Sequence, residues 1–365
     1  MVKNLHHEPF DEGTLTKLAI FEAYLKEWLP VFIQQSSPTI YIADLFAGPG
    51  KDKNGEPGSP IRLIETVYLY KESIQAKGLK VEVIFNELDT DKFTHLKRNL
   101  ESVRDKMFYE PKFYNEDFID LFDRLEPDWK EAPCLLFMDQ NGIKQVTQDI
   151  LKRMADLSRT DFIFFISSSY FIRFCDDPAF KKYFPDLNSD ELKECEYNDI
   201  HRKILEHYRK LLSFESPMRM FPFSIKKGAN IYGLIFGTKH ILGADKFLDI
   251  TWELNKINGE ANFDIDKDLS KKEQKVLFAE FKQKTKLDEF DENLTEYISK
   301  KGVVSNKEIY DFAIDNGFTH KHAADVVKSL LKEKKIEKMF KSNGLFIGYK
   351  QCYREEKKVN FKWKE

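Results

Sequence analysis

The chain has 365 residues, of which 42% are apolar and 33% charged, and its formal net charge is −3. This length and balance predict a globular protein with a sizeable core, divided into two or three domains. The first residues lack the apolar core of a signal peptide, and no apolar run reaches the roughly eighteen residues of a bilayer span. We therefore expect a cytoplasmic protein that makes no contact with a membrane.

The four cysteines lie far apart and form no Cys-x-x-Cys pair: Cys134, Cys175, Cys195 and Cys352. This spacing predicts reduced thiols. The histidines are not spaced as metal ligands either, so the sequence predicts no metal site. His201 and His207 are six residues apart, which places them on different faces of a helix, and we expect both to be in solvent.

Residues 14–35 place apolar side chains at helical spacing, and this predicts an amphipathic helix that Pro30 kinks or ends early. Short apolar runs then alternate with amphipathic segments. The expected strands span 39–45, 81–87, 112–117, 134–140 and 161–167, and the expected helices span 59–75, 90–103, 118–125 and 145–156. Because the apolar runs are uninterrupted, we expect strands covered on both faces, as in a parallel sheet flanked by helices.

A helical stretch over 170–215 follows these elements. Two further apolar segments, 218–227 and 230–240, then predict an antiparallel hairpin that closes the sheet. We assign residues 1–260 to this first domain, with 170–215 as a helical insertion, and residues 261–289 to a helical linker.

Residues 290–365 follow a different pattern, in which three helices precede two short strands around the sequence SNG. This is the order of a winged helix-turn-helix, whose third helix, here at 320–336, can enter a major groove. The segment carries 16 Lys and Arg against 12 Asp and Glu, whereas the other residues carry 42 against 49. The basic excess is typical of a surface that faces a polyanion. The alternative is a winged helix that dimerises or binds protein and has a solvated basic face.

The sequence DLFAGPG at 44–50 ends the first strand with an acid followed by two glycines. Gly48 and Gly50 allow positive φ and let a ligand approach the backbone closely. Asp44 would repel a pyrophosphate and favour a cation. S-adenosylmethionine (SAM) carries a sulfonium and an ammonium group and no phosphate, so the turn favours SAM as the cofactor. A nicotinamide-dependent oxidoreductase is disfavoured, because the third glycine of G-x-G-x-x-G is missing and a long loop precedes the helix.

Polar residues also follow the other strands of the expected sheet. Glu87 ends the second strand, where a carboxylate can bind both ribose hydroxyls of a nucleoside. Asp117 ends the third strand and can accept a hydrogen bond from an adenine amino group, while Phe118 can lie against the ring. Asp139 ends the fourth strand. Because these ends meet at one edge of the sheet, we expect them to form one binding site.

The chain resembles the three-Cys-motif partner proteins, a bacterial family, in the segments YIADLFAGPG, GEPGSP, NELD, MDQNGIKQV and FLDITWELN. The resemblance covers most of the chain. It implies an α/β, Rossmann-like class I methyltransferase fold with a seven-stranded mixed sheet, SAM as the cofactor, and a C-terminal winged-helix-like domain. The family is named after cysteines in a neighbouring protein, which the resemblance implies as a protein partner.

The resemblance also assigns roles to individual residues. Glu87 matches the ribose acid, and Asp117 and Phe118 match the adenine site. Asp139 matches a strand-end acid that, in methyltransferases acting on base amino groups, holds the target amino group. The residues that match the cofactor turn are Asp44, Phe46, Ala47, Gly48 and Gly50.

The sequence departs from this pattern after the fourth strand, where DQNG lacks the expected proline and aromatic residue. Asp139 and Asn141 can still accept hydrogen bonds from an amino group and are the catalytic candidates. A ring that stacks the base must come from elsewhere, such as Tyr170 or Phe171, for which core packing is the more ordinary role. Two functions therefore stay open. One is a SAM-dependent methyltransferase acting on nucleic acid (DNA or RNA), with a base amino group as one target; the other is a degenerate methyltransferase-fold protein that binds cofactor, nucleic acid or a protein partner without methyl transfer.

Overall fold

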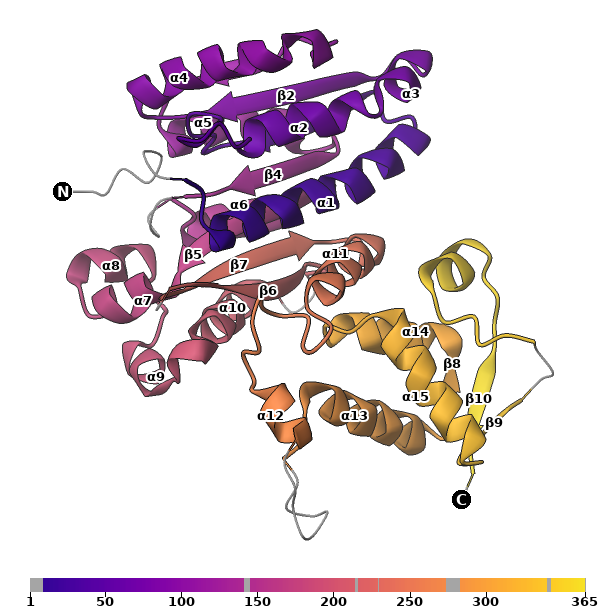
Figure 1. Ribbon diagram of the computed structural model, residues 1–365. Helices are drawn as coiled ribbons and strands as arrows, with labels where there is room; N and C mark the ends of the chain where they lie inside the picture. The colour runs from indigo at the N-terminus through magenta and orange to yellow at the C-terminus, as the bar shows by residue number, and fades with distance from the viewer. Residues whose placement is uncertain are drawn as a thin grey trace. The chain divides into compact units, whose positions relative to one another are not determined.

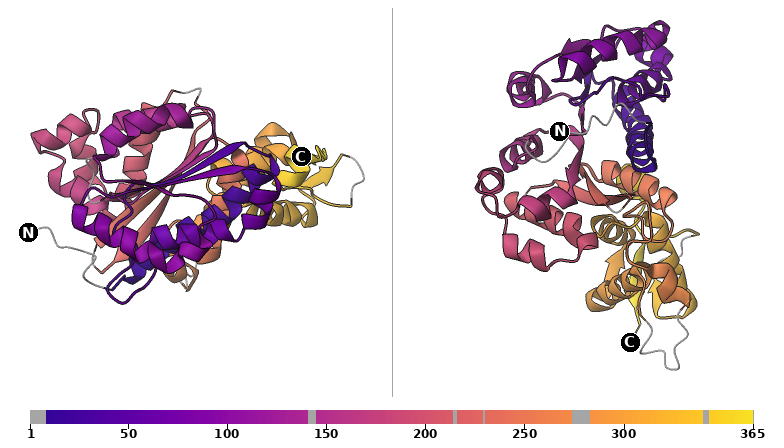
Figure 2. Two further views of the ribbon diagram at one scale, coloured as in Figure 1. Left: turned by 90° about the horizontal axis from the view of Figure 1, so that it is seen from above. Right: turned by 60° about the vertical axis from the view of Figure 1, so that its left-hand side comes forward.

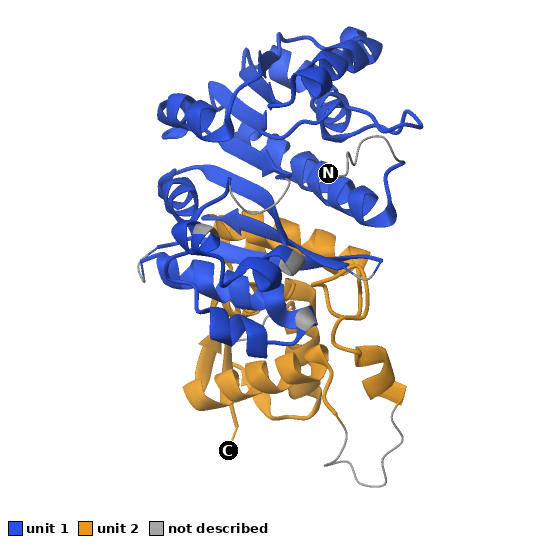
Figure 3. Ribbon diagram, turned by 90° about the vertical axis from the view of Figure 1, so that its left-hand side faces the viewer, with its two compact units in different colours: residues 1–239 blue, residues 240–365 orange. Residues whose placement is uncertain are grey.

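The computed structural model describes residues 9–140, 145–213, 216–228, 230–273, 283–339 and 343–364. The chain forms two compact units, Met1–Lys239 and His240–Glu365, drawn in blue and orange in Figure 3. The sequence places the end of the first domain near residue 260 instead. Helix α11, Ile241–Leu254, lies in the second of these units, where its Trp252 indole N–H donates a hydrogen bond to the Gly317 carbonyl at 2.9 Å.

The sheet of the first unit contains the strands β1 Thr39–Asp44, β2 Lys80–Asn86, β3 Lys112–Tyr114, β4 Cys134–Met138, β5 Thr160–Ser167, β6 Arg219–Lys227 and β7 Asn230–Thr238 (Figure 1). Their order is β3-β2-β1-β4-β5-β7-β6. The first five strands are parallel, and β7 is antiparallel to both β5 and β6. The predicted seven-stranded mixed sheet and its closing hairpin are therefore confirmed.

Helices lie on both sides of this sheet (Figure 2). They are α1 Glu12–Gln34, α2 Ser59–Tyr68, α3 Lys71–Ala76, α4 Thr90–Leu100, α5 Phe118–Trp129, α6 Gln148–Asp156, α7 Ser168–Phe174, α8 Pro178–Tyr183, α9 Ser189–Glu194 and α10 Ile200–Leu211. Leu136 of β4 belongs to the core that also includes α5, α6 and α10. Its neighbour Phe137 instead stacks on Phe21 of α1, with ring centroids 4.2 Å apart. Successive residues of β4 thus contact opposite layers, which explains why the strand is apolar throughout. Helix α1 continues through Pro30 to Gln34 rather than ending early.

The second unit has the winged-helix order that the sequence predicts. After α11 it contains α12 Asp268–Glu273, α13 Lys286–Lys301, β8 Val303–Ser305, α14 Asn306–Asp315, α15 His320–Lys332, β9 Ile336–Lys338 and β10 Asn360–Trp363. The strands form an antiparallel sheet in the order β8-β10-β9.

The second wing strand lies later in the chain than the sequence predicts. We expected it directly after SNG, but Phe346 there has a φ of 53°, which is incompatible with an extended strand. The strand is β10 instead, where Phe361 is fully buried.

No helix in the described part of the chain is long and apolar enough to cross a membrane.

Candidate functional site

Asp44 ends β1, and its side chain is fully buried. Its Oδ1 atom accepts a hydrogen bond from the Phe46 N–H at 3.4 Å, whereas Oδ2 has no hydrogen-bond partner among the described residues. Burial raises the pKa of Asp44 to about 7. The Ser59 side chain and the Phe46 N–H oppose this shift, while the carboxylates of Asp139 and Glu87 add to it. An unsatisfied buried oxygen close to two further acids marks a place where a donor or a cation is favoured.

The glycine turn after β1 is held by the end of β2. Gly48 and Gly50 have φ values of 61° and 82°, in the left-handed region that favours glycine. The Gly48 N–H donates a hydrogen bond to Glu87 Oε2 at 2.9 Å, and Glu87 Oε1 accepts one from the Asp89 N–H at 2.9 Å. Glu87 is half-buried, and each carboxylate oxygen can accept a further hydrogen bond. The acid expected to bind ribose therefore lies beside the turn expected to bind the cofactor.

Asn86, which is not among the residues predicted from the sequence, also holds this turn in place. Its carbonyl accepts a hydrogen bond from the Ala47 N–H at 2.8 Å. Its buried side-chain amide donates to the Leu45 carbonyl at 3.3 Å and to the Glu116 carbonyl at 3.2 Å. Asn86 therefore connects the segments that follow β1 and β3. A polar residue at the end of an apolar strand was the signal in the sequence.

The loop after the glycine turn folds back onto it. The Gly58 N–H donates to the Gly50 carbonyl at 2.9 Å, and a Cβ atom on Gly58 would lie only 3.2 Å from that oxygen. Arg62 of α2 forms ion pairs with Glu56 of the loop at 2.7 Å and with Glu22 of α1 at 2.8 Å. The loop is thus braced by two helices, and this pairing favours a role for Glu56 in ordering the loop.

The residues expected to bind adenine begin helix α5. Asp117 caps this helix, since its Oδ1 atom accepts a hydrogen bond from the Ile119 N–H at 2.8 Å. Phe118 is buried in the core, where its ring lies 5.2 Å from Phe46 and 5.8 Å from Phe122. Phe46 is half-buried and therefore presents more ring surface to a ligand than Phe118 does. The adenine contacts of Asp117 and Phe118 stay predictions.

Asp139, the first catalytic candidate, forms an ion pair with Lys17 of α1. The exposed fractions of the two side chains are 29% for Asp139 and 17% for Lys17. The Lys17 ammonium also lies 5.0 Å from the centre of the Phe165 ring of β5. Lys17 is not among the residues predicted from the sequence, because nothing in an amphipathic pattern indicates which distant strand end a lysine will reach.

The chain after Asp139 is fixed by Gln140, which is buried. Its Nε2 atom donates to the Phe165 carbonyl at 3.1 Å, and its Oε1 atom accepts from the N–H groups of Gln145 and Val146 at 3.2 Å. Gln140 therefore has a structural role in this turn. Asn141, the second catalytic candidate, lies outside the described residues.

The two aromatic candidates for stacking a base differ in exposure. Phe171 is fully buried, and its ring packs against Phe180 and Phe184 at 5.4 and 5.0 Å. Tyr170 is 43% exposed and lies 5.0 Å from the Phe174 ring. Of the two, only Tyr170 therefore presents a ring to solvent.

Comparison with known proteins gives a family match for the C-terminal part. Residues 262–343 match the GMT-like wHTH domain. This match agrees with the helices and wing of the second unit. No curated protein matches the sequence.

Among solved structures, the chain is similar to several methyltransferases. A SAM-dependent methyltransferase from Agrobacterium tumefaciens is 9% identical over 59% of this chain and 61% of that chain, with a TM-score of 0.30. The O-methyltransferase from Bacillus cereus in complex with SAH is also similar: it is 14% identical over 63% of this chain and 91% of that chain, with a TM-score of 0.33. The O-methyltransferase TomG from Streptomyces achromogenes in complex with SAM is 13% identical over 63% of this chain and 90% of that chain, with a TM-score of 0.34. The match thus spans less than two thirds of the first of these proteins. Identities and scores this low describe a general likeness, and the site residues of this chain rest on their own geometry.

Proposed function

We propose that this chain is a SAM-dependent methyltransferase that acts on nucleic acid in the cytoplasm. The observation that carries the proposal is Asp44, a buried acid with an unpaired oxygen directly before a left-handed glycine turn. It lies at the end of β1, between β2 and β4, where the strand order reverses. Ligands of doubly wound sheets bind at this switch point, outside the carboxyl ends of the strands. A cation stabilises the ionised acid, whereas a diphosphate would be repelled.

The residues around Asp44 suit the remaining parts of such a donor. Gly48 and Gly50 give the turn its left-handed backbone, and Glu87 offers acceptor positions to ribose hydroxyls. Phe46 presents a half-buried ring whose centroid lies 5.2 Å from that of Phe118, the residue after Asp117. When bound, SAM supplies an activated methyl group. The protein then has mainly to place the acceptor in line with it and to exclude water.

Asp139 is the group we assign to the acceptor. A carboxylate accepts hydrogen bonds from an amino or hydroxyl group, and Lys17 restricts the orientations that this carboxylate can adopt. Lys17 is therefore a positioning residue in this proposal. Asn141 and Tyr170 remain candidates for a second acceptor of hydrogen bonds and for a stacking ring.

The nucleic-acid part of the proposal rests on the winged-helix domain and its basic excess. In the second unit, Lys332 and Lys334 are exposed at the end of α15 and in the turn that follows. Lysines at such positions can contact phosphates without reading sequence. A protein partner that carries a three-Cys motif is an additional expectation from the family resemblance.

The Lys17–Asp139 pair also favours a second function. Lys17 pairs with the carboxylate that would accept hydrogen bonds from an amino group. The residues after this strand also lack the proline and aromatic residue of amino methyltransferases. On this view the first unit binds the cofactor or a partner protein without transferring a methyl group.

Transfer of label from radioactive SAM to total cellular nucleic acid separates the two functions. The proposal predicts labelled nucleic acid with the wild type, and loss of label with Asp139→Ala while SAM binding is retained. Digestion by DNase or RNase then identifies the substrate. If the wild type binds SAM but labels neither nucleic acid, the binding function replaces the enzymatic one. Glu116→Ala is the control, because Glu116 also follows a strand of the sheet but pairs with Arg124.

A further inference from the structure

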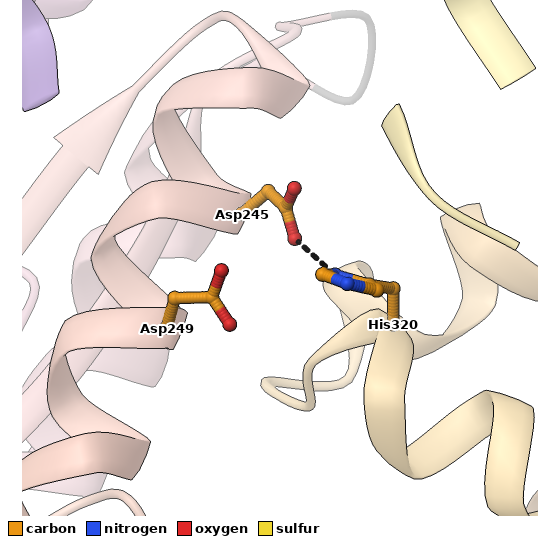
Figure 4. Close-up of side chains that lie close together, drawn as sticks. All are labelled: Asp245, Asp249 and His320. Carbon is orange, nitrogen blue, oxygen red and sulfur yellow. Dashed lines mark hydrogen bonds and ion pairs between the residues drawn. The ribbon is translucent and has the colours of Figure 1, made fainter. Parts of the chain in front are cut away.

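Two carboxylates and one imidazole come together in the second unit (Figure 4). Asp245 and Asp249 lie one turn apart on α11, so both side chains are on the same face of the helix. His320 begins α15, and its Nδ1 atom lies 3.2 Å from Asp245 Oδ1. One ligand atom of each residue lies within 4.8 Å of the other two. Figure 4 shows both carboxylates pointing toward the imidazole ring.

A fourth polar group lies beside this cluster and lacks a partner. The Tyr310 side chain is fully buried, and its hydroxyl has no hydrogen-bond partner among the described residues. Burial raises the pKa of Tyr310, and the Asp245 carboxylate adds to the shift through its charge and as a nearby hydrogen-bond acceptor, so the two groups lie close together, short of a well-formed hydrogen bond. Asp245 is itself 5% exposed. A buried phenol that faces a buried acid without a well-formed hydrogen bond leaves a polar position that a ligand of this cluster could complete.

We propose that Asp245, Asp249 and His320 bind a divalent transition-metal ion of the Zn²⁺ type. Ligand atoms at about 2.0–2.2 Å from such an ion lie about 3–4 Å apart, so the observed cluster needs only small side-chain movements. An imidazole nitrogen with two carboxylate oxygens suits Zn²⁺ and related ions better than Mg²⁺ or Ca²⁺, which prefer oxygen ligands alone. Three protein ligands leave further positions for water. The ion would link α11 to α15.

The competing explanation is that the cluster consists of two ordinary ion pairs. Lys321 Nζ lies 3.2 Å from Asp249 Oδ1, and His320 pairs with Asp245. The lysine side chain is 68% exposed, so it can move into solvent when an ion enters. If an ion does bind, Lys321 is its competitor, and removal of this lysine must strengthen binding. If no ion binds, removal of Lys321 changes only a surface ion pair.

Calorimetric titration of Zn²⁺ into the full chain, freed of metal by a chelator, tests the proposal. We expect one ion per chain. Asp249→Asn and His320→Ala should weaken binding about tenfold or more, whereas Lys321→Met should strengthen it several-fold. His95→Ala, which removes an exposed histidine of α4, is the control and should leave the affinity unchanged. Mg²⁺ and Ca²⁺ should bind much more weakly than Zn²⁺.

Thermal unfolding with and without Zn²⁺ gives a second readout. The wild type and Lys321→Met should gain stability on addition of the ion, because it ties two helices together, and Asp249→Asn should gain much less. Absence of Zn²⁺ binding by the wild type would overturn the proposal. So would an unchanged affinity in both His320→Ala and Asp249→Asn, since the ion would then bind elsewhere. A Lys321→Met variant that is no tighter than the wild type also contradicts it.

Discussion

Lys17 of α1 forms an ion pair with Asp139 at the end of β4, although the two residues are 122 positions apart in the chain. Burial raises the pKa of Asp44 at the end of β1, and the charge of Asp139 adds to this shift. The first helix therefore contributes a positive charge to the edge where we place the methyl donor. Lys17 offsets one of the negative charges that surround the buried acid.

A double-mutant cycle of Lys17→Met and Asp139→Asn measures this relationship. The side chains are both less than a third exposed, so we expect a coupling free energy on the order of 1 kcal/mol in denaturant unfolding. Lys26→Met on the same helix is the control, because it breaks a more exposed pair with Glu22. Additive effects of the two site substitutions would show that the pair contributes nothing to stability.

The buried Asp44 should make stability depend on pH. Its folded pKa is about 7, against an ordinary value of 3.8. Between these values the unfolded chain releases the proton while the folded chain keeps it, so the free energy of unfolding falls as pH rises from about 4 to 7. The loss is about 1.4 kcal/mol per pH unit, or on the order of 4 kcal/mol in all.

Asp44→Asn removes this titration while keeping the shape of the side chain. The variant should be close to the wild type in stability at pH 4 and clearly more stable at pH 8, in denaturant unfolding without added ligand. Asp120→Asn, at an exposed position of α5, is the control and should show no such pH-dependent difference. A stability difference that stays constant over this range would mean that Asp44 is not held in its neutral form.

Alanine substitution at two glycines with similar backbone angles distinguishes the effect of local strain on SAM binding from the effect of the shape of the turn. Gly50 and Gly55 have φ values of 82° and 85°, so alanine at either position costs about 1–2 kcal/mol. A Cβ atom on Gly50 would also lie 3.2 Å from a Leu96 methyl group, whereas one on Gly55 would meet nothing within 4 Å. We expect Gly50→Ala to weaken SAM binding more than Gly55→Ala does, as measured by calorimetry. Equal affinities would show that the shape of this turn does not matter for binding.

Glu87→Gln tests the acid at the end of β2. The amide oxygen can keep the hydrogen bond from Gly48, but the NH2 group cannot accept the one from Asp89, and the charge and the acceptor positions that we assign to a ribose hydroxyl on that side are lost. The affinity for SAM should therefore fall about tenfold, with a small decrease in melting temperature from the lost hydrogen bond of Asp89. Glu116→Gln, after β3, should leave the affinity unchanged. If both variants bind as the wild type does, Glu87 serves only to hold the turn.

Much of the fold could be predicted because burial on both faces leaves a clear pattern. The apolar runs that became β1 and β4 have no charged residue inside them, and β2 has only Glu82. The acids and glycines at the ends of these strands stand out. Asp44 and Glu87 were found in this way, and the structure brings both to the Gly48 turn. Local spacing was enough, because each feature lies within a few residues of a strand end.

Contacts between distant segments could not be predicted in the same way. The partner of Asp139 depends on where α1 packs, and the sequence of α1 does not indicate this. The prediction that His201 lies in solvent is wrong, because His201 is fully buried and hydrogen-bonded to the Ser224 hydroxyl at 2.7 Å. His201 lies on the buried face of α10, and its hydrogen-bond partner Ser224 lies on β6, which follows this helix in the chain. His207 is half-buried and lies 2.7 Å from the Gln148 amide.

Calorimetric titration of SAM into the wild type and Asp44→Asn, at pH 6 and pH 8, tests the central claim most directly. We predict one SAM per chain at millimolar concentration or below. Binding should be tighter at pH 8, where Asp44 is ionised, and weaker in Asp44→Asn at both values. NAD, which presents a diphosphate, should not compete. Absence of SAM binding at millimolar concentration, or binding of NAD in its place, would contradict the account.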